Sequence, residues 1–203
     1  GPGGGTPGGD AGPVDNQSLA LSDAEAKYLQ DAEHLGGFVL GDLTLPQLGA
    51  AIGARDESAL SSYLSEGFSG ELFAKHSGES VSLGVAEART WKAQRDPTRP
   101  VDAAEFVAAV LGWRDEFSKL ESSSLKVMLM RPETHAAFDG PWVGSLKLRL
   151  TGWDSEGRIL EREVRFRCKL SSLTEDQPRQ RGWLSECVAY EARFTRAREH
   201  LLE

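Results

Sequence analysis

The chain has 203 residues, enough for one domain with a sizeable core, and 39% of them are hydrophobic and 27% charged, as in globular proteins. Its formal net charge of −8 argues against nucleic acid as the main partner, because phosphate binding needs a positive surface. No apolar run approaches the roughly 18 residues that cross a membrane, so we expect no transmembrane segment.

The first 17 residues differ in composition from the remainder. Residues 1–17 are mostly Gly and Pro and show no periodicity, which predicts a flexible tether that cannot bury a core. Such tethers are common just after the leader of exported or lipid-anchored bacterial proteins. The cysteine that a lipid anchor requires does not stand at position 1. We therefore expect an exported chain, periplasmic or extracellular, with a lipid anchor of the full precursor left open. Residues 18–203 are expected to form a single domain.

The first predicted helix begins at a capping box. Ser22 can accept a hydrogen bond from the backbone three residues later, where Glu25 can return the interaction. Residues 24–35 are therefore expected to be helical. Gly36-Gly37 is expected to end this helix, because glycine is common just beyond helix C-termini.

Three more helices are expected further along the chain. Residues 45–54 carry apolar side chains at helical spacing behind an N-terminal proline. Asp56 can cap the next helix, which Gly67 is expected to end, and Asp102 can cap a longer helix over residues 103–120.

The segment between the third and fourth helices has a mixed pattern. Residues 68–73 predict a short strand. Residues 74–100 have no clear periodicity, and their end, RDPTRP, is interpreted as a loop because of its two prolines. Trp91 and Trp113 are assigned to helical stretches, where they would line the core or a groove.

The second half of the chain changes from helical to strand periodicity. Alternating apolar and polar residues predict strands over residues 125–130, 142–151, 159–170 and 183–195. Turns join these runs, so we expect an antiparallel meander with one solvated face. Helices followed by a meander predict the α+β class, with the helices packed on a curved antiparallel sheet.

Several segments carry a resemblance to known families. The helix-to-strand segment ARDESALSSYLSEGFSGE resembles nuclear-transport-factor-2-like domains, which have the cone fold, or cystatin-like roll. The segments LSDAEAKYLQDAEHLGG, LGAAIGARDESALSSYLSEGFSGEL, FDGPWVGSLKLRLTG and RGWLSECVAYEARFTRA resemble the N-terminal region of bacterial FG-GAP repeat proteins of the ASPIC/UnbV group. In those exported proteins a cone-like domain precedes a β-propeller.

The resemblance implies a non-catalytic interaction or assembly domain. Its expected partner is a second copy of the chain or a following propeller, and no FG-GAP repeat occurs in the sequence itself. The solvated sheet face is expected to be polar, so such a contact would be polar. We expect no cofactor, since two cysteines 19 residues apart do not make a zinc site.

Cone-fold enzymes suggest the alternative function. Ketosteroid isomerases and polyketide cyclases place an Asp or His in a pocket between helices and sheet, where an apolar wall moves its pKa towards the operating pH. The alternation expected for residues 183–195 places Glu186 on the inner face, where it would meet Arg162 as a base, an anion site or a structural ion pair. His76 and His135 are weaker candidates, because both lie in loop-like segments.

The same alternative implies a ligand pocket. Its ligand would be small and either apolar or anionic. The residues expected to line the pocket are Arg162, Glu186, Trp142, Trp183 and Tyr190.

The two cysteines are expected on adjacent strands. Cys168 alternates in phase with Phe166, whereas Cys187 alternates out of phase with Val188. Without a bulge the two side chains would point to opposite faces, so we expect two free, packed thiols. A disulfide is the alternative in an exported protein.

Overall fold

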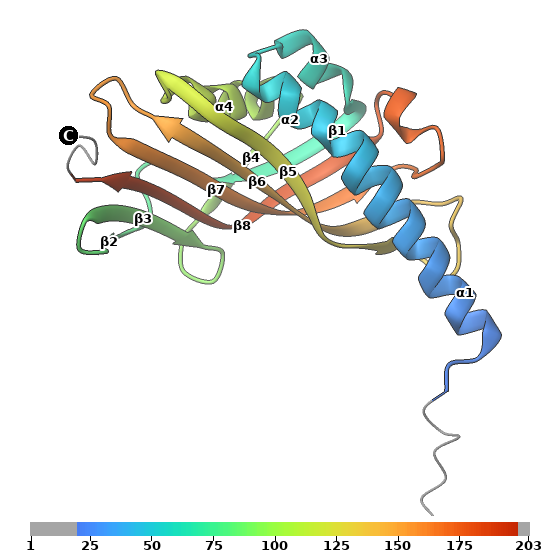
Figure 1. Cartoon of the computed structure of the whole chain (residues 1–203). Coiled ribbons are helices and arrows are strands. Elements are labelled where there is room, and N and C mark those ends of the chain that lie inside the picture. Colours follow the sequence, from blue (N-terminus) through green and yellow to red (C-terminus); the bar gives the residue numbers. More distant parts are fainter. Residues whose placement is uncertain (1–19, 199–203) are drawn as a thin grey trace, which may run out of the picture.

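The structure, a computed structural model, describes residues 20–198 as helices packed on a large curved sheet (Figure 1). The expected α+β class is confirmed. The predicted tether, residues 1–17, lies outside the described residues. The elements in chain order are α1 (Asp23–Ala32), the π-helical η2 (Glu33–Thr44), α2 (Leu45–Gly53), α3 (Glu57–Ser62), β1 (Leu64–Phe73), β2 (Glu79–Ser82), β3 (Ala86–Lys92), β4 (Thr98–Val101), α4 (Ala103–Asp115), β5 (Lys119–Pro132), β6 (Trp142–Trp153), β7 (Ile159–Leu170), the 3₁₀ turn η3 (Gln177–Arg179) and β8 (Leu184–Ala197).

The sheet contains the predicted meander. Its strands follow the order β2-β3-β8-β7-β6-β5, and β5 to β8 pair antiparallel with their chain neighbours. The other edge of β8 is shared between two partners. Its first part pairs in parallel with β1, and its last part pairs antiparallel with β3. The hairpin β2–β3 therefore extends the sheet beside the end of β8.

The expected break at Gly36-Gly37 is wrong, because the helical segment Asp23–Gly53 is continuous over 31 residues. It runs diagonally across the end of the sheet and projects beyond it (Figure 1). A Cβ at Gly36 would lie 3.3 Å from the Met130 Cβ, and one at Gly49 would lie 2.8 Å from the Ser123 carbonyl oxygen. These glycines therefore allow the helix to lie close to β5.

The continuous helix is also long and apolar enough, by length and composition, to cross a membrane, which the expectation from sequence did not foresee. Half of its most apolar stretch is buried within the protein. The core helix of a globular fold passes the same test, so this helix is weak evidence for a membrane span.

The three predicted N-caps are confirmed, whereas the start expected at residue 45 lies inside the continuous helix. Ser22 and Asp102 each accept a hydrogen bond from the backbone three residues later and form capping boxes, and Asp56 accepts one from the Ala59 N–H. Two predicted ends are wrong. The third helix ends at Ser62 rather than Gly67, because β1 begins at Leu64, and the fourth ends at Asp115.

Residues 74–100 hold more regular structure than expected. They contain β2, β3 and β4, and Trp91 lies on β3 rather than on a helix. The turn of the β2–β3 hairpin includes Gly84, whose φ of +74° is a conformation that favours glycine. The helical assignment of Trp91 is therefore wrong, because the residue lies on a hairpin that places it against the sheet.

The strand β8 departs from simple alternation at two bulges. Ser185 and Tyr190 have no register partner on β7. After each of these bulges the alternation shifts by one residue, so the positions that face inward switch twice along the strand. Glu186 is exposed on the outer face, and its expected inward position is wrong. Cys187 is buried on the same face as Cys168, so the expectation that the cysteines point to opposite faces is also wrong.

Candidate ligand-binding cleft

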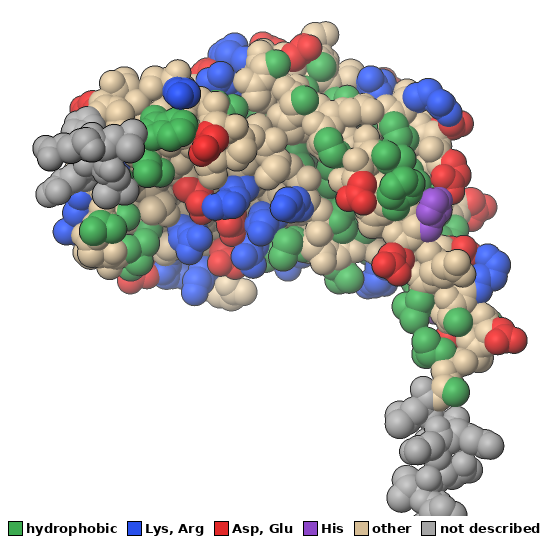
Figure 2. Space-filling model, viewed as in Figure 1, with side chains coloured by type: hydrophobic (Ala, Val, Ile, Leu, Met, Phe, Trp, Pro, Cys, Tyr) green, Lys and Arg blue, Asp and Glu red, His purple; other side chains and the backbone are tan. Residues whose placement is uncertain are grey.

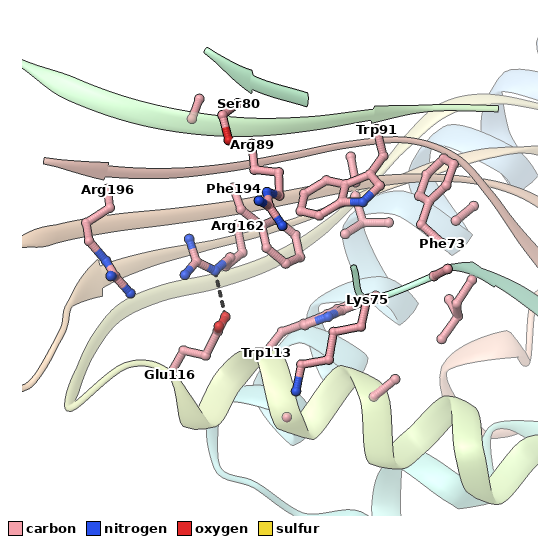
Figure 3. Close-up of a pocket in the computed structure, with 18 of the residues that line it drawn as sticks. Phe73, Lys75, Ser80, Arg89, Trp91, Trp113, Glu116, Arg162, Phe194 and Arg196 are labelled. Carbon is pink, nitrogen blue, oxygen red and sulfur yellow. Dashed lines mark hydrogen bonds and ion pairs between the residues drawn. The ribbon is translucent and has the colours of Figure 1, made fainter. Parts of the chain in front are cut away.

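A cleft of about 1110 Å³ lies between α4 and the inner face of β3, β8 and β7. The end of β1 and the β2–β3 hairpin form its rim. Figure 3 shows side chains from all these elements converging on it. The residues that line it include Phe73, Lys75, Arg89, Trp91, Gly112, Trp113, Glu116, Arg162 and Phe194.

Aromatic side chains form the apolar part of the cleft. Phe194 lies at the centre, with its ring centroid 4.9 Å from that of Trp91 and 6.0 Å from that of Trp113, both edge-on. Trp91 comes from β3 and Trp113 from α4, so the two indoles belong to opposite walls. Such a set of rings offers large apolar area with little side-chain entropy to lose on binding.

Arg162 is the buried cation of the cleft. It projects inward from β7 with 5% of its surface exposed, as its alternation predicted. Its Nε donates to Glu116 Oε2 over 2.6 Å, and its Nη1 donates to the backbone carbonyls of Glu161 and Thr195. The guanidinium carbon lies 4.7 Å from the Phe194 ring centroid. These contacts hold the guanidinium in one orientation.

Arg89 and Lys75 have no such partners. Within residues 20–198, neither side chain makes a hydrogen bond or an ion pair. Figure 3 shows the Arg89 guanidinium and the Lys75 side chain directed into the cleft. The remaining basic residues of the lining are each paired with a carboxylate: Arg99 with Glu105, Arg196 with Asp154 and Arg198 with Glu87.

The charge of the cleft opposes that of the whole chain. Six lining residues are Lys or Arg and two are Glu, whereas the chain has a formal net charge of −8. A positive cleft with apolar walls concentrates field lines and attracts anions to its interior. The lining is therefore suited to a molecule with both an apolar part and a negative charge.

The structure separates the residues that the sequence analysis grouped into one pocket. Arg162 lines the cleft, but Trp142 and Trp183 are fully buried in the core. Glu186 and Tyr190 line a shallow groove of about 580 Å³ on the outer face of the sheet. The expected pair of Arg162 and Glu186 is therefore not formed, because the bulges turn Glu186 away.

The two histidine candidates lie outside the cleft. His76 is exposed in the turn between β1 and β2. His135 lies in the loop between β5 and β6, where its ring stacks on Tyr28 with centroids 4.5 Å apart. Neither histidine is among the residues that line the cleft. Among residues 20–198, no group of three or more His, Cys, Asp or Glu side chains is placed to hold a metal ion.

The sequence analysis missed most of the cleft lining, including Phe73, Lys75, Arg89, Glu116 and Phe194. Arg89 and Trp91 are two positions apart, so in a strand both would point to the same face. The strand was missed because the turn before it contains Leu-Gly, which is a weaker hairpin signal than Asn-Gly or Asp-Gly.

Comparisons with protein-family models, curated proteins and solved structures found no match. The resemblance to nuclear-transport-factor-2-like domains and to FG-GAP repeat proteins therefore stays a prediction, as do export and a following propeller. The fold and the cleft define the chain as an α+β protein with a basic, aromatic-lined cleft.

Proposed function

We propose that this domain binds a small organic molecule in the cleft between α4 and the sheet. The observation that carries the proposal is the cleft itself: about 1110 Å³ of space with indoles on two opposite walls. Ligand sites in proteins are typically concave, about 300–1,000 Å³ in volume and mostly apolar, with a few polar groups that orient the ligand.

Binding is better supported than catalysis. The two carboxylates of the lining are both engaged with arginines, Glu116 with Arg162 over 2.6 Å and Glu87 with Arg198 over 3.4 Å. A general base needs a free carboxylate or imidazole within reach of the substrate. Of the described residues that line the cleft, none is a histidine. The isomerase or cyclase alternative therefore lacks a free base at this site.

The uncharged fluorophore N-phenyl-1-naphthylamine provides a direct test. We expect it to bind wild-type protein, gain fluorescence and accept energy from Trp91 and Trp113. Gly112 on α4 lines the cleft, and a Cβ there would meet no atom within 4 Å. The Gly112→Phe variant should therefore fill the cleft without disturbing the fold, and abolish binding.

The matched control is Ala104→Phe, an exposed position on the same helix that does not line the cleft. It should bind the probe as wild type does. Equal binding by wild type and Gly112→Phe would place the probe elsewhere and refute the proposal, as would no binding by wild type. Thermal unfolding of both variants checks that each is folded.

Self-association through the edge strand β5 is a second candidate function. The outer face of the sheet is polar as expected, with Arg149 and Arg193 both contacting Glu161, and Figure 2 shows acidic and basic side chains intermingled over the strands. At the edge, however, Leu129 is 60% exposed and Met128 47%. A second copy of the chain would cover this apolar edge.

Light scattering across a range of protein concentrations tests this second candidate. We expect a dimer at high concentration that Leu129→Lys weakens, because the lysine would place a charge in the interface. A wild-type chain that stays monomeric throughout would exclude the edge as a self-association site.

A further inference from the structure

We propose that the ligand of the cleft is an amphipathic acid, an apolar or aromatic molecule with one carboxylate or similar oxyanion, whose acidic group binds between Arg89 and Arg162. This inference rests on the proposed binding function and specifies the chemical class of the ligand. It depends on the register of three adjacent strands and on the hydrogen bonds that the two arginines make or lack.

The two arginines flank Phe194 in register. Arg89 on β3 and Arg162 on β7 are both the register partners of Phe194 on β8. Adjacent strands lie about 4.8 Å apart, so the two arginine backbones are separated by about 10 Å. Figure 3 shows both guanidinium groups on the cleft side of the sheet, directed towards the space over Phe194.

Arg162 is prepared to bind an anion. Its Nε is occupied by Glu116 and its Nη1 by two backbone carbonyls, whereas its Nη2 has no hydrogen-bond partner within residues 20–198. The side chain is already immobilised, so an incoming oxyanion would not have to order it. A charge-assisted hydrogen bond to such a fixed guanidinium is stronger than one between neutral groups.

Arg89 supplies a second positive charge that no described residue neutralises. Arg89 is exposed and Arg162 is paired with Glu116, so these three lining residues carry an excess of one positive charge. A bound monoanion would balance that excess. The charge count thus favours a ligand with a single acidic group.

The aromatic walls next to the two arginines indicate that the rest of the ligand is apolar. The rings of Trp91, Trp113 and Phe73 lie further along the cleft from the two guanidinium groups (Figure 3). A ligand whose acid contacts Arg89 and Arg162 would place its apolar body against these rings. A bare inorganic anion would leave the apolar area uncovered, so the apolar body should contribute to affinity.

A pair of fluorescent probes tests the acidic group. The sulfonate 8-anilinonaphthalene-1-sulfonate and the uncharged N-phenyl-1-naphthylamine share the same rings and differ in the acidic group. We expect wild-type protein to bind the sulfonate at least about tenfold more tightly, the range for a hydrogen bond to a charged group. The Arg89→Gln variant should remove most of this preference, by weakening the binding of the sulfonate much more than that of the uncharged probe.

Arg193→Gln is the matched control. Arg193 is on the same strand as Phe194, is exposed and does not line the cleft, so its loss changes net charge equally without removing a ligand contact. It should retain the preference for the sulfonate. Naphthoate should displace the bound sulfonate, and acetate at the same concentration should not, because it lacks an apolar body.

The outcomes separate this inference from the proposed function. Binding of the uncharged probe with no preference for the sulfonate overturns the acidic-ligand inference and leaves the binding function standing. An equal loss in Arg89→Gln and Arg193→Gln assigns the preference to net charge and also overturns it. Failure of both probes to bind wild-type protein overturns both proposals.

Discussion

Cys168 on β7 and Cys187 on β8 are register partners, and their buried Sγ atoms lie 3.2 Å apart as free thiols. A disulfide bond is about 2.05 Å long, so a small approach of the two sulfur atoms would bring them into bonding distance. Simple alternation of the sequence predicts that these two side chains point to opposite faces of the sheet. The bulges at Ser185 and Tyr190 shift the alternation between them, so Cys187 points to the same face as Cys168.

We predict that refolding in a glutathione redox buffer joins Cys168 to Cys187. Two thiols would lose two electrons and two protons to oxidised glutathione, forming one disulfide and two molecules of reduced glutathione. Intact-mass analysis should show the loss of two hydrogens in the monomer, and Cys187→Ala should not show it. Disulfide-linked dimers, or an unchanged mass after refolding, would contradict the prediction.

We also predict that stability decreases at alkaline pH. Burial raises the pKa of the Cys187 thiol well above its usual range, and the hydrogen bond with Cys168 raises it further. A folded-state pKa above the unfolded value stabilises the protein fully below the unfolded pKa, about 8.5, and this stabilisation is lost as pH rises towards the folded pKa.

Denaturant titrations of reduced protein at a series of pH values from neutral to alkaline measure this effect. The free energy of unfolding should fall above the unfolded thiol pKa more steeply in wild type than in Cys187→Ala. Identical slopes in the two proteins would show that the thiol does not contribute to the pH dependence.

Strict alternation was the part of the sequence that predicted side-chain direction correctly. β6 and β7 pair without a register shift, so Arg162 faces inward as expected. β8 carries two extra residues relative to β7, one at each bulge. The hydrophobic pattern of the sequence did not indicate where these bulges lie. That is why Glu186 was assigned to the pocket and Cys187 to the outer face.

The glycines of the long helix show a second limit of local patterns. Gly36-Gly37 resembles a helix end, because glycine is a common residue at that position. In the structure the packing of the helix on β5 has the larger influence, and Gly36 and Gly49 are the points where the helix backbone approaches the strand. A close approach between segments distant in sequence cannot be read from either segment alone.

Two glycine-to-alanine variants test the continuous helix. A Cβ at Gly49 would lie 2.8 Å from the Ser123 carbonyl oxygen, so Gly49→Ala should lower the free energy of unfolding by about 1–3 kcal/mol. At Gly37 the nearest atom would be 3.8 Å away, on a flexible Glu33 side chain. Gly37→Ala should raise stability by up to about 1 kcal/mol, since alanine favours helix.

Chemical denaturation of both variants measures these changes. A destabilised Gly37→Ala protein would indicate that the helix ends at Gly36-Gly37 after all. A Gly49→Ala protein as stable as wild type would show that the helix does not pack on β5 as closely as the structure has it.

The ion pair of the cleft leads to the last prediction. Removing Glu116 leaves the buried Arg162 Nε without a partner, whereas removing Arg162 leaves a Glu116 carboxylate that is 41% exposed and can be hydrated. Glu116→Ala should therefore destabilise the protein by about 1–3 kcal/mol, the cost of an unsatisfied buried donor. Arg162→Met, which keeps the apolar stem and its contact with Phe194, should change stability by less.

Denaturant unfolding of the two single variants and the double variant measures the coupling. The double variant should be close in stability to Arg162→Met, because Glu116 contributes little to the free energy of unfolding once Arg162 is absent. Additive losses in the double variant would mean that the two side chains stabilise the fold independently. In that case Glu116 would not be the group that holds the guanidinium in place for a ligand.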